Sequence, residues 1–321
     1  MRGSAPAPAA SRRRRAFSRS VMRGIDCASL IGRRLRAGGV IRRLIGVVPA
    51  VGAGLLLAAI AAGEAPSTTF RVCADPNNLP FSNDKLEGFE NKIAELVAGD
   101  LGASPTFTWW PDRRGFIRNT LRAGQCDVVM GVPNGYDLVR WTRPYYRSSY
   151  VFVSVRDGEF PVRSWDDPAL RRARIGVVAA TPPADALVKK GLIRNVVSYR
   201  LTIDYTTEHP GEIIDDVAAG KIDVAIVWGP IAGYFAQKQS VRLDVVPVPE
   251  LPDVGIPFQY EISMGVRRGD VERQSQLDEI LERKGREIRQ LLAEYGVPLV
   301  EGPLVRKPDE IRRGVAGERY Q

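Results

Sequence analysis

Histidine and cysteine are scarce in this sequence, and their scarcity argues against two kinds of active site. Its 321 residues include one histidine and three cysteines. The histidine, His209, lies in the loop-like segment TTEHPGE, where no nucleophile or acid is visibly paired with it. We therefore expect neither a histidine-dependent catalytic site nor a Cys/His metal site, and no cofactor or metal of the protein's own. A carboxylate-only enzyme that uses Asp75 or Glu90 remains the catalytic alternative.

Acidic residues are nearly absent from the first 63 residues, where twelve of the 46 lysines and arginines meet a single acid, Asp26. A basic block with arginines at 12–15 precedes an apolar run over 44–62, and the small residues at 59–61 offer a cleavage site. That order predicts a secretory signal peptide with a basic leader over 1–65, removed on export. An uncleaved membrane anchor is the alternative, because the run approaches the spanning length of about 20 residues. We favour cleavage, with no stable membrane insertion afterwards.

The formal net charge of +9 originates in this leader. Without residues 1–63, the chain has 34 basic and 36 acidic residues, so it is slightly acidic. A nucleic-acid-binding protein needs a basic surface that neutralises phosphates. We therefore expect no nucleic-acid partner.

Two cysteines, Cys73 and Cys126, remain after the expected cleavage. Thiols tend to oxidise outside the cytoplasm, so a single structural disulfide is the expected state. Closing a loop of about 50 residues stabilises a fold by about 4 kcal/mol through chain entropy. A metal site is the weaker interpretation, because the only imidazole, His209, is far away along the chain.

Short apolar runs alternate with helical patterns beyond residue 68. Strands are expected at 70–74 and 106–109, and a helical face follows each of them. This alternation predicts an α/β fold with mainly parallel sheets flanked by helices. A last long helix is expected over 276–295, ended by Gly296, and Thr181 is expected to cap another helix.

An internal repeat indicates two similar lobes. LRAGQCDVVMGVP at 121–133 resembles VAAGKIDVAIVWGP at 217–230, with a shared Ala-Gly-x-x-Asp-Val spaced 96 residues apart. In each copy a glycine, Gly124 or Gly220, suits the left-handed position that ends a helix, and a buried strand follows. The chain then crosses between the lobes twice, which gives a two-strand hinge. We expect one lobe from 68–152 plus 259–300, the other from 155–256, and a polar C-terminal tail over 301–321.

Three segments, RVCADPNNLPFSN, CDVVMGVPNGYD and TRPYYRSSYVFV, together resemble the J proteins of methanol-oxidation operons (the MoxJ/XoxJ family), within the type II periplasmic solute-binding proteins. The wider solute-binding pattern covers nearly all of the chain beyond the leader. The resemblance implies a periplasmic accessory of a pyrroloquinoline-quinone (PQQ) alcohol dehydrogenase, needed for its activity or maturation. The implied partners are this methanol dehydrogenase and its cytochrome c, and PQQ with calcium or a lanthanide would belong to the partner.

Amino-acid receptors that resemble this chain grip the ligand carboxylate with a guanidinium. At the aligned position this sequence has Tyr136, although Glu90 could still meet an ammonium group. An intact amino-acid site is therefore not expected. A transport receptor for another small polar solute remains an alternative, because such receptors also lack that arginine.

Arg140, Arg143 and Arg147 surround Tyr145 and Tyr146 in the sequence. Arginine and tyrosine are favoured anchors of protein interfaces, so these five residues predict a docking surface for the dehydrogenase. A solvated basic loop with both tyrosines packed on the lobe is the equally weighted alternative.

Further candidates lie near expected strand ends, where ligands of open α/β sheets bind. The aromatic ones would line an apolar groove for a protein segment or simply pack between elements. The polar ones would bond a guest or simply form turns. The aromatic candidates are Phe81, Tyr136, Tyr150, Trp228 and Tyr260, and the polar candidates are Asp75, Asn77, Asn78 and Asn134.

Overall fold

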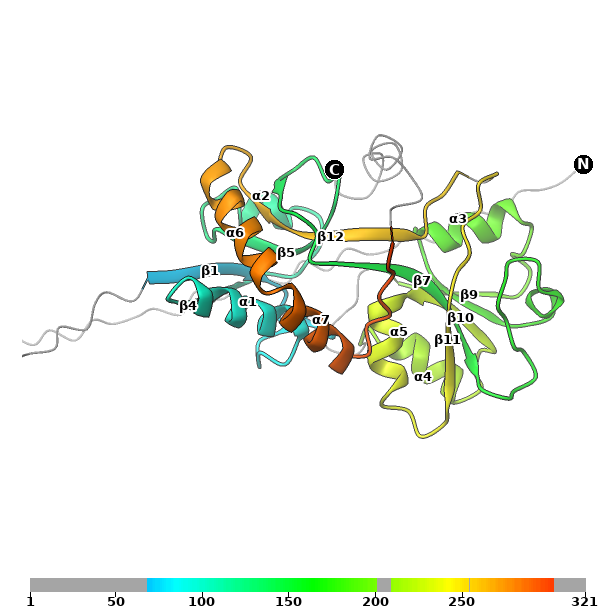
Figure 1. Cartoon of the computed structure of the whole chain (residues 1–321). Helices are drawn as coiled ribbons and strands as arrows, with labels where there is room; N and C mark the ends of the chain where they lie inside the picture. Colours follow the sequence, from blue (N-terminus) through cyan, green and yellow to red (C-terminus); the bar gives the residue numbers. More distant parts are fainter. Residues whose placement is uncertain (1–67, 201–208, 254, 303–321) are drawn as a thin grey trace, which may run out of the picture. The chain divides into compact units, whose positions relative to one another are not determined.

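The computed structural model describes residues 68–200, 209–253 and 255–302 (Figure 1). The expected signal peptide over 1–65 and the tail beyond 302 lie outside these residues, so both remain predictions. The architecture is α/β, as the alternation of patterns predicts. No helix in the described part has the length and apolar character of a membrane span.

The first sheet is built around β1 (Thr68–Ala74), which is parallel to its two neighbours, β4 (Ala103–Trp109) and β5 (Val128–Pro133). β12 (Gln259–Val266) pairs with the other side of β5 in the antiparallel sense, and short β6 (Arg140–Trp141) pairs with β12. The strands expected at 70–74 and 106–109 are thus confirmed. A separate ribbon of β2 (Asn77–Asn78) and β3 (Ser82–Asn83) follows β1.

The second sheet contains β10 (Val224–Trp228), parallel to β8 (Ile175–Val178), which is in turn parallel to β9 (Val196–Tyr199). β7 (Tyr146–Val155) lies antiparallel to β10, and β11 (Leu243–Pro247) pairs with β7 as well. The first residues of β7, 146–149, pair with β12, so β7 belongs to both sheets (Figure 1). The lobe limits of 68–152, 155–256 and 259–300 remain predictions.

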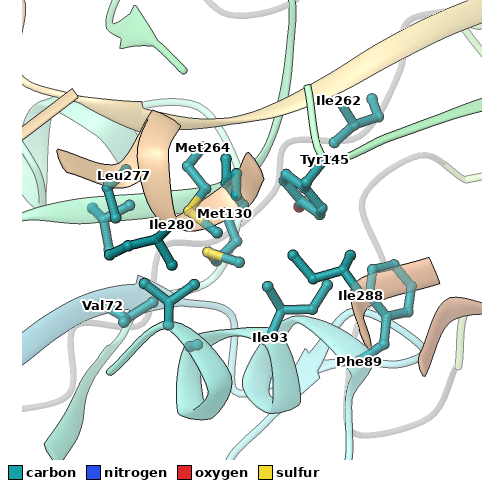
Figure 2. Packing of buried hydrophobic residues seen from close by; sticks show 14 of the residues in the cluster. Val72, Phe89, Ile93, Met130, Tyr145, Ile262, Met264, Leu277, Ile280 and Ile288 are labelled. Carbon is teal, nitrogen blue, oxygen red and sulfur yellow. The ribbon is translucent and has the colours of Figure 1, made fainter. Parts of the chain in front are cut away.

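Helices pack against both sheets and close four hydrophobic clusters, two in each lobe. In α1, Phe89, Ile93 and Val97 recur at helical spacing and are buried against the first sheet. Figure 2 shows Phe89 and Ile93 in this core. The helices near the first sheet are α1 (Phe89–Asp100), α2 (Phe116–Asn119), α6 (Val271–Arg283) and α7 (Gly285–Glu294). Those near the second are the short 3-10 helix Pro168–Arg171, α3 (Pro182–Lys189), α4 (Glu212–Ala218) and α5 (Gly229–Ala236).

Three details of the helices correct the sequence-based expectations. The single long helix over 276–295 is wrong, because the chain breaks into α6 and α7 at Lys284, next to Gly285, whose low helix propensity favours an interruption. α6 also begins earlier than expected, after Asp270, which caps it by accepting a backbone N–H. Thr181 precedes α3, but its hydroxyl donates to a carbonyl at the end of β8 and does not cap the helix.

The internal repeat is confirmed by its hydrogen bonds. In the first copy, Arg71 pairs with Asp127 at 2.7 Å and donates to the carbonyl of Gly124. In the second, Arg174 pairs with Asp223 at 2.6 Å and donates to the carbonyl of the aligned glycine. Both glycines have positive φ, 74° and 68°, which favours glycine. The two lobes therefore share one local structure at the start of β5 and β10.

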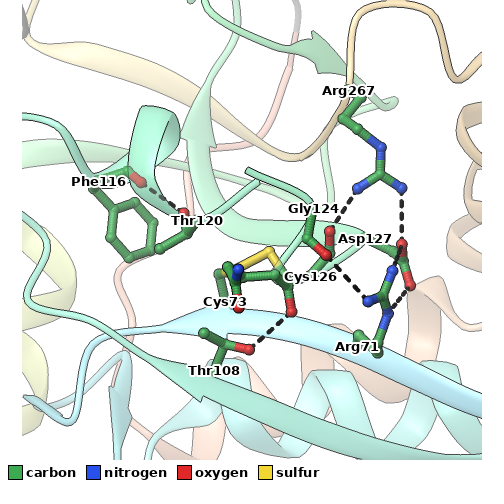
Figure 3. Close-up of a disulfide and its surroundings, with 10 residues drawn as sticks. Arg71, Cys73, Thr108, Phe116, Thr120, Gly124, Cys126, Asp127 and Arg267 are labelled. Atoms are coloured by element: carbon green, nitrogen blue, oxygen red, sulfur yellow. Dashed lines mark hydrogen bonds and ion pairs between the residues drawn. A yellow bond between two sulfur atoms is a disulfide. The ribbon is translucent and has the colours of Figure 1, made fainter. Parts of the chain in front are cut away.

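The first copy carries two additional links (Figure 3). The expected disulfide between Cys73 and Cys126 is confirmed, and it joins β1 to the segment before β5. Asp127 also accepts a hydrogen bond from Arg267 at 2.8 Å, which connects the repeat to the residue after β12. Three separate parts of the chain thus meet at one corner of the first lobe, beside the buried disulfide.

Candidate functional site

A pocket of about 270 Å³ lies at the carboxyl end of β5, beside α2. Its apolar lining consists of Phe116, Ile117, Val129, Met130 and Val132, all of them buried. Its charged lining consists of Asp112, Arg114, Arg118 and Arg122, all of them exposed. Carboxyl ends of parallel strands are the usual ligand positions in α/β sheets, so this pocket is the candidate site.

A buried carboxyl group lies against the pocket wall at Gly131. The Tyr145 hydroxyl donates to Glu90 Oε1 at 3.0 Å and accepts the Gly131 N–H at 3.0 Å. Gly131 has a φ of 71°, and a Cβ there would lie 2.7 Å from Glu90 Oε1, so this position requires glycine. Burial raises the pKa of Glu90 to about 8; the Tyr145 bond opposes this shift and the charge of Asp112 adds to it. Glu90 is therefore neutral at pH 7 and provides no negative charge for an ammonium group.

Asp75 fixes two loops beside the pocket. Its carboxylate accepts the backbone N–H of Asn77 at 2.9 Å and that of Asp112 at 2.6 Å. Desolvation, and then the charge of Asp75, raise the pKa of Asp112 to about 6. The side chain of Asp112 is exposed, and the neighbouring charge of Asp75 favours its protonated form. Asn77 and Asn78 form β2, which fits the turn interpretation of this loop, and their ligand role remains a prediction.

Tyr136 lines the pocket at the position where an amino-acid receptor would place arginine. Its side chain is half-buried, and burial followed by the charge of Asp112 raises the pKa of its phenol to about 12. The phenol therefore keeps its proton and offers one hydroxyl, whereas a guanidinium offers a charged, two-pronged donor. The expectation that an amino-acid site is not intact remains a prediction.

The predicted docking surface around 140–147 is smaller than expected. Tyr145 and Tyr146 are only 8% and 6% exposed and belong to the core of the first lobe, so they cannot anchor a partner (Figure 2 shows Tyr145). Arg140 bonds Gln274, and Arg143 pairs with Glu282 at 2.7 Å, both on α6. Both tyrosines pack on the lobe, as the alternative interpretation expected, whereas the docking role of the arginines remains a prediction. Arg143 and the neighbouring Trp141 remain exposed.

Arg147 and Asn134 belong to a polar network at the end of β5. Arg147 pairs with Glu261 at 2.6 Å and also donates to the Gly302 carbonyl. Asn134 donates to the other oxygen of Glu261 at 3.1 Å and accepts from the Ser263 hydroxyl. These contacts tie β5, β7 and β12 together. The structure thus gives both residues a positioning role, and a role in partner binding remains a prediction.

The remaining aromatic candidates pack on one another. Tyr150, Trp228 and Tyr260 form a three-ring cluster where β7, β10 and β12 meet, with centroids 5.3 to 6.4 Å apart. The Trp228 side chain also hydrogen-bonds Tyr146, which joins the second sheet to the first. Phe81 packs edge-on against Phe89 at 5.4 Å. Packing accounts for the positions of all these rings, and their role in lining a groove remains a prediction.

The sequence analysis missed the charged rim of the pocket. Arg114, Arg118 and Arg122 recur every four residues, a spacing that places side chains on one side of a helical turn. That spacing could have predicted a shared arginine surface. It is weak evidence here, because the segment lies in a loop-rich stretch and α2 is only four residues long. Asp112 was missed because its partner Asp75, which follows β1, lies 37 residues earlier in the chain.

Comparison with known proteins places the chain in a family. No protein-family model matches it. It is 30% identical over 253 residues to the protein MoxJ of Methylorubrum extorquens AM1, covering 74% of this chain and 84% of the relative. It is also 30% identical over 264 residues to MoxJ of Paracoccus denitrificans, covering 78% and 96%. The chain belongs to the MoxJ family.

Solved structures agree with this membership. The crystal structure of the periplasmic binding protein XoxJ from Methylobacterium extorquens AM1 matches with a TM-score of 0.62 and 37% identity, over 73% of this chain and all of the other. The fold is therefore that of the type II periplasmic binding proteins, as the resemblance implied. Within the described residues, no group of three or more His, Cys, Asp and Glu side chains could hold a metal ion.

Proposed function

We propose that the protein is a periplasmic accessory of a PQQ-dependent methanol or alcohol dehydrogenase, to which it binds to support activity or maturation. Membership of the MoxJ family is the observation that carries this proposal, because that family belongs to the methanol oxidation system. PQQ and its metal ion would stay with the dehydrogenase, and a cytochrome c is the second partner to be tested.

The chemistry of the candidate site supports a role other than amino-acid uptake. A free amino acid needs a cation for its carboxylate and an anion for its ammonium group. Tyr136 takes the place of the clamping arginine, and Glu90 is buried, bonded to Tyr145 and neutral at pH 7. These two positions therefore provide neither the cation for the carboxylate nor the anion for the ammonium group.

A transport receptor for another small solute is the second candidate, and the pocket of about 270 Å³ is the observation that favours it. The enzyme alternative has less support. Asp75 is bonded to two backbone N–H groups and Glu90 to a tyrosine, so neither carboxyl group is presented to a substrate. We therefore propose a binding function and no catalysis.

The experiment measures direct binding to a purified PQQ methanol dehydrogenase, with and without its cytochrome c, by interferometry. In parallel, the dye-linked activity of the dehydrogenase is measured as this protein is added. We expect saturable binding and a higher active fraction of enzyme. Absence of binding together with unchanged activity, in calcium-type and lanthanide-type dehydrogenases alike, would overturn the proposal.

Matched variants locate the contact. Trp141→Ala combined with Arg143→Ala removes the exposed arginine of the predicted docking surface and the exposed tryptophan beside it. Val188→Ala combined with Ile193→Ala removes two exposed apolar side chains of the second lobe and serves as the control. We expect the first pair to weaken binding by about tenfold, since interface anchors of this type contribute roughly 1–2 kcal/mol. Equal effects of the two pairs would refute this location but leave the function standing.

A further inference from the structure

Three arginines line the candidate pocket without a carboxylate partner. Within residues 68–200, 209–253 and 255–302, no ion pair or side-chain hydrogen bond involves Arg114, Arg118 or Arg122. Several other arginines of the first lobe are paired: Arg71 and Arg267 bond Asp127, Arg140 and Arg143 bond α6, and Arg147 bonds Glu261. The arginines that hold the lobe together are thus different from those that line the pocket.

The charge of the pocket favours an anion. Three guanidinium groups line it against one carboxylate, Asp112. The backbone N–H of Asp112 is bonded to Asp75, and its one carboxylate cannot balance three guanidinium charges. Guanidinium groups bind carboxylates through two parallel hydrogen bonds, which makes a carboxylate the best-matched small anion.

The size and the lining of the pocket define the rest of the ligand. Its volume of about 270 Å³ falls just below the range of about 300–1,000 Å³ that is typical of pockets for drug-sized ligands. Buried side chains of α2 and β5, among them Ile117, Val129 and Val132, provide an apolar surface next to the arginines. A ligand that matches both features has one carboxylate and a compact apolar body of about the size of one ring.

We propose that this pocket binds a small organic carboxylate with a compact apolar body, held by Arg114, Arg118 and Arg122 and packed on the apolar wall of α2 and β5. This site goes beyond the proposed accessory function and does not depend on it, since it needs no dehydrogenase. An accessory protein with such a site would be a receptor for a small acid as well as a partner of an enzyme.

The first test uses one skeleton with three charges. Benzoate, benzamide and benzylamine are titrated into the purified protein at low ionic strength and followed by calorimetry and by NMR shifts. Benzoate should bind saturably, benzamide at least about tenfold more weakly, and benzylamine not at all. Acetate, which has the carboxylate without the ring, should also bind at least about tenfold more weakly than benzoate. Similar affinities of the three aromatic probes, or no saturable binding of benzoate, would overturn the proposal.

The second test assigns the binding to the pocket. Arg118→Gln and Arg122→Gln should each weaken benzoate binding by about fivefold, and the triple Gln variant should abolish it. Arg113→Gln is the matched control, because Arg113 is an exposed neighbour that does not line the pocket. All of these side chains are exposed, so the variants should fold, and thermal unfolding checks this. An equal loss of affinity in Arg113→Gln and Arg118→Gln would contradict the site.

The two proposals fail separately. Benzoate binding without dehydrogenase binding would leave the carboxylate pocket standing and remove the accessory function. Dehydrogenase binding without benzoate binding would do the reverse.

Discussion

In the first lobe, β5 follows the hydrogen-bonded motif of the repeat, formed by Arg71, Gly124 and Asp127. The strand leads into a loop at 134–138, part of which lines the pocket. In the second lobe, β10 follows the equivalent motif, formed by Arg174, Gly220 and Asp223, and leads directly into α5, which begins at Gly229. One strand end thus faces a pocket and the other is covered by a helix. The two lobes use one local structure for different purposes.

The covered end provides contact between the lobes. A Cβ on Gly233 of α5 would lie 1.8 Å from the carbonyl oxygen of Gly296, at the end of α7. Next to it, Tyr234 and Tyr295 stack with centroids 5.7 Å apart. The helix after β10 therefore packs directly on the chain that ends the first lobe. A difference of a few residues after a shared motif separates an open pocket from a packed helix.

Removing the disulfide should have the largest effect, because it occurs only in the first copy of the repeat. We expect the double variant Cys73→Ser/Cys126→Ser to lose about 4 kcal/mol of unfolding free energy, from the entropy of closing a loop of 53 residues. Urea unfolding followed by tryptophan fluorescence measures this. Reduction of the unmodified protein should produce the same loss and leave the variant unchanged. A loss below about 1 kcal/mol would mean that the corner holds without the disulfide.

The buried Glu90 should give the first lobe its own pH dependence. The second residue of α1 is Glu90, whereas the second residue of α3 is Pro183, so only one lobe has this carboxyl group. Its pKa is raised from 4.5 to about 8 in the folded protein. The folded state therefore binds the proton more tightly, and stability is highest below about pH 4.5 for this group and falls as pH rises towards 8.

The variant Glu90→Gln tests that dependence. It should remove a slope of about 1 kcal/mol per pH unit, on the order of 3 kcal/mol between about pH 5 and pH 8, and be the more stable protein at pH 8. Chemical unfolding at several pH values measures the difference. Asp112 also titrates near pH 6, and because it is present in both proteins its contribution cancels in the comparison to first order. A pH-independent difference would show that Glu90 does not titrate in this range.

Sequence reasoning predicted features that depend on nearby residues or on a shared motif. The β1 and β5 strands, the repeat at Gly124 and Gly220 and the disulfide all follow from local patterns and redox context. Sequence reasoning failed to predict contacts between residues that are far apart in the sequence. Tyr145 is buried because α1 and β5 supply Glu90 and Gly131 as partners, and Arg143 is held by a helix more than a hundred residues later. No local pattern contains those partners.

Adding a methyl group at the contact between the lobes should have an intermediate effect on stability. Gly233→Ala places a methyl group against the Gly296 carbonyl, so α5 or the end of α7 must shift. We expect a loss of about 2 kcal/mol, typical of overpacking. Gly220→Ala provides no comparable clash, although its positive φ adds strain of about 1 kcal/mol. A smaller loss for Gly233→Ala than for Gly220→Ala would mean that the lobe contact is loose.

The smallest expected effect is the difference in stability between variants of the two aspartates of the repeat, Asp127 and Asp223. Asp127 bonds two arginines, Arg71 and Arg267, whereas Asp223 bonds only Arg174. Burial opposes the change, but these arginines hold the pKa of Asp127 below its ordinary value, and Arg174 does the same for Asp223. We expect Asp127→Asn to cost about 1 kcal/mol more than Asp223→Asn at pH 7, a modest difference because the arginines are partly exposed. For a lowered pKa, the stabilisation is present above the ordinary carboxyl pKa and is lost as pH falls through the folded value. The difference between the two variants should therefore shrink as pH falls below the ordinary carboxyl pKa of 3.8, and a difference that stays constant there would assign it to packing instead of charge.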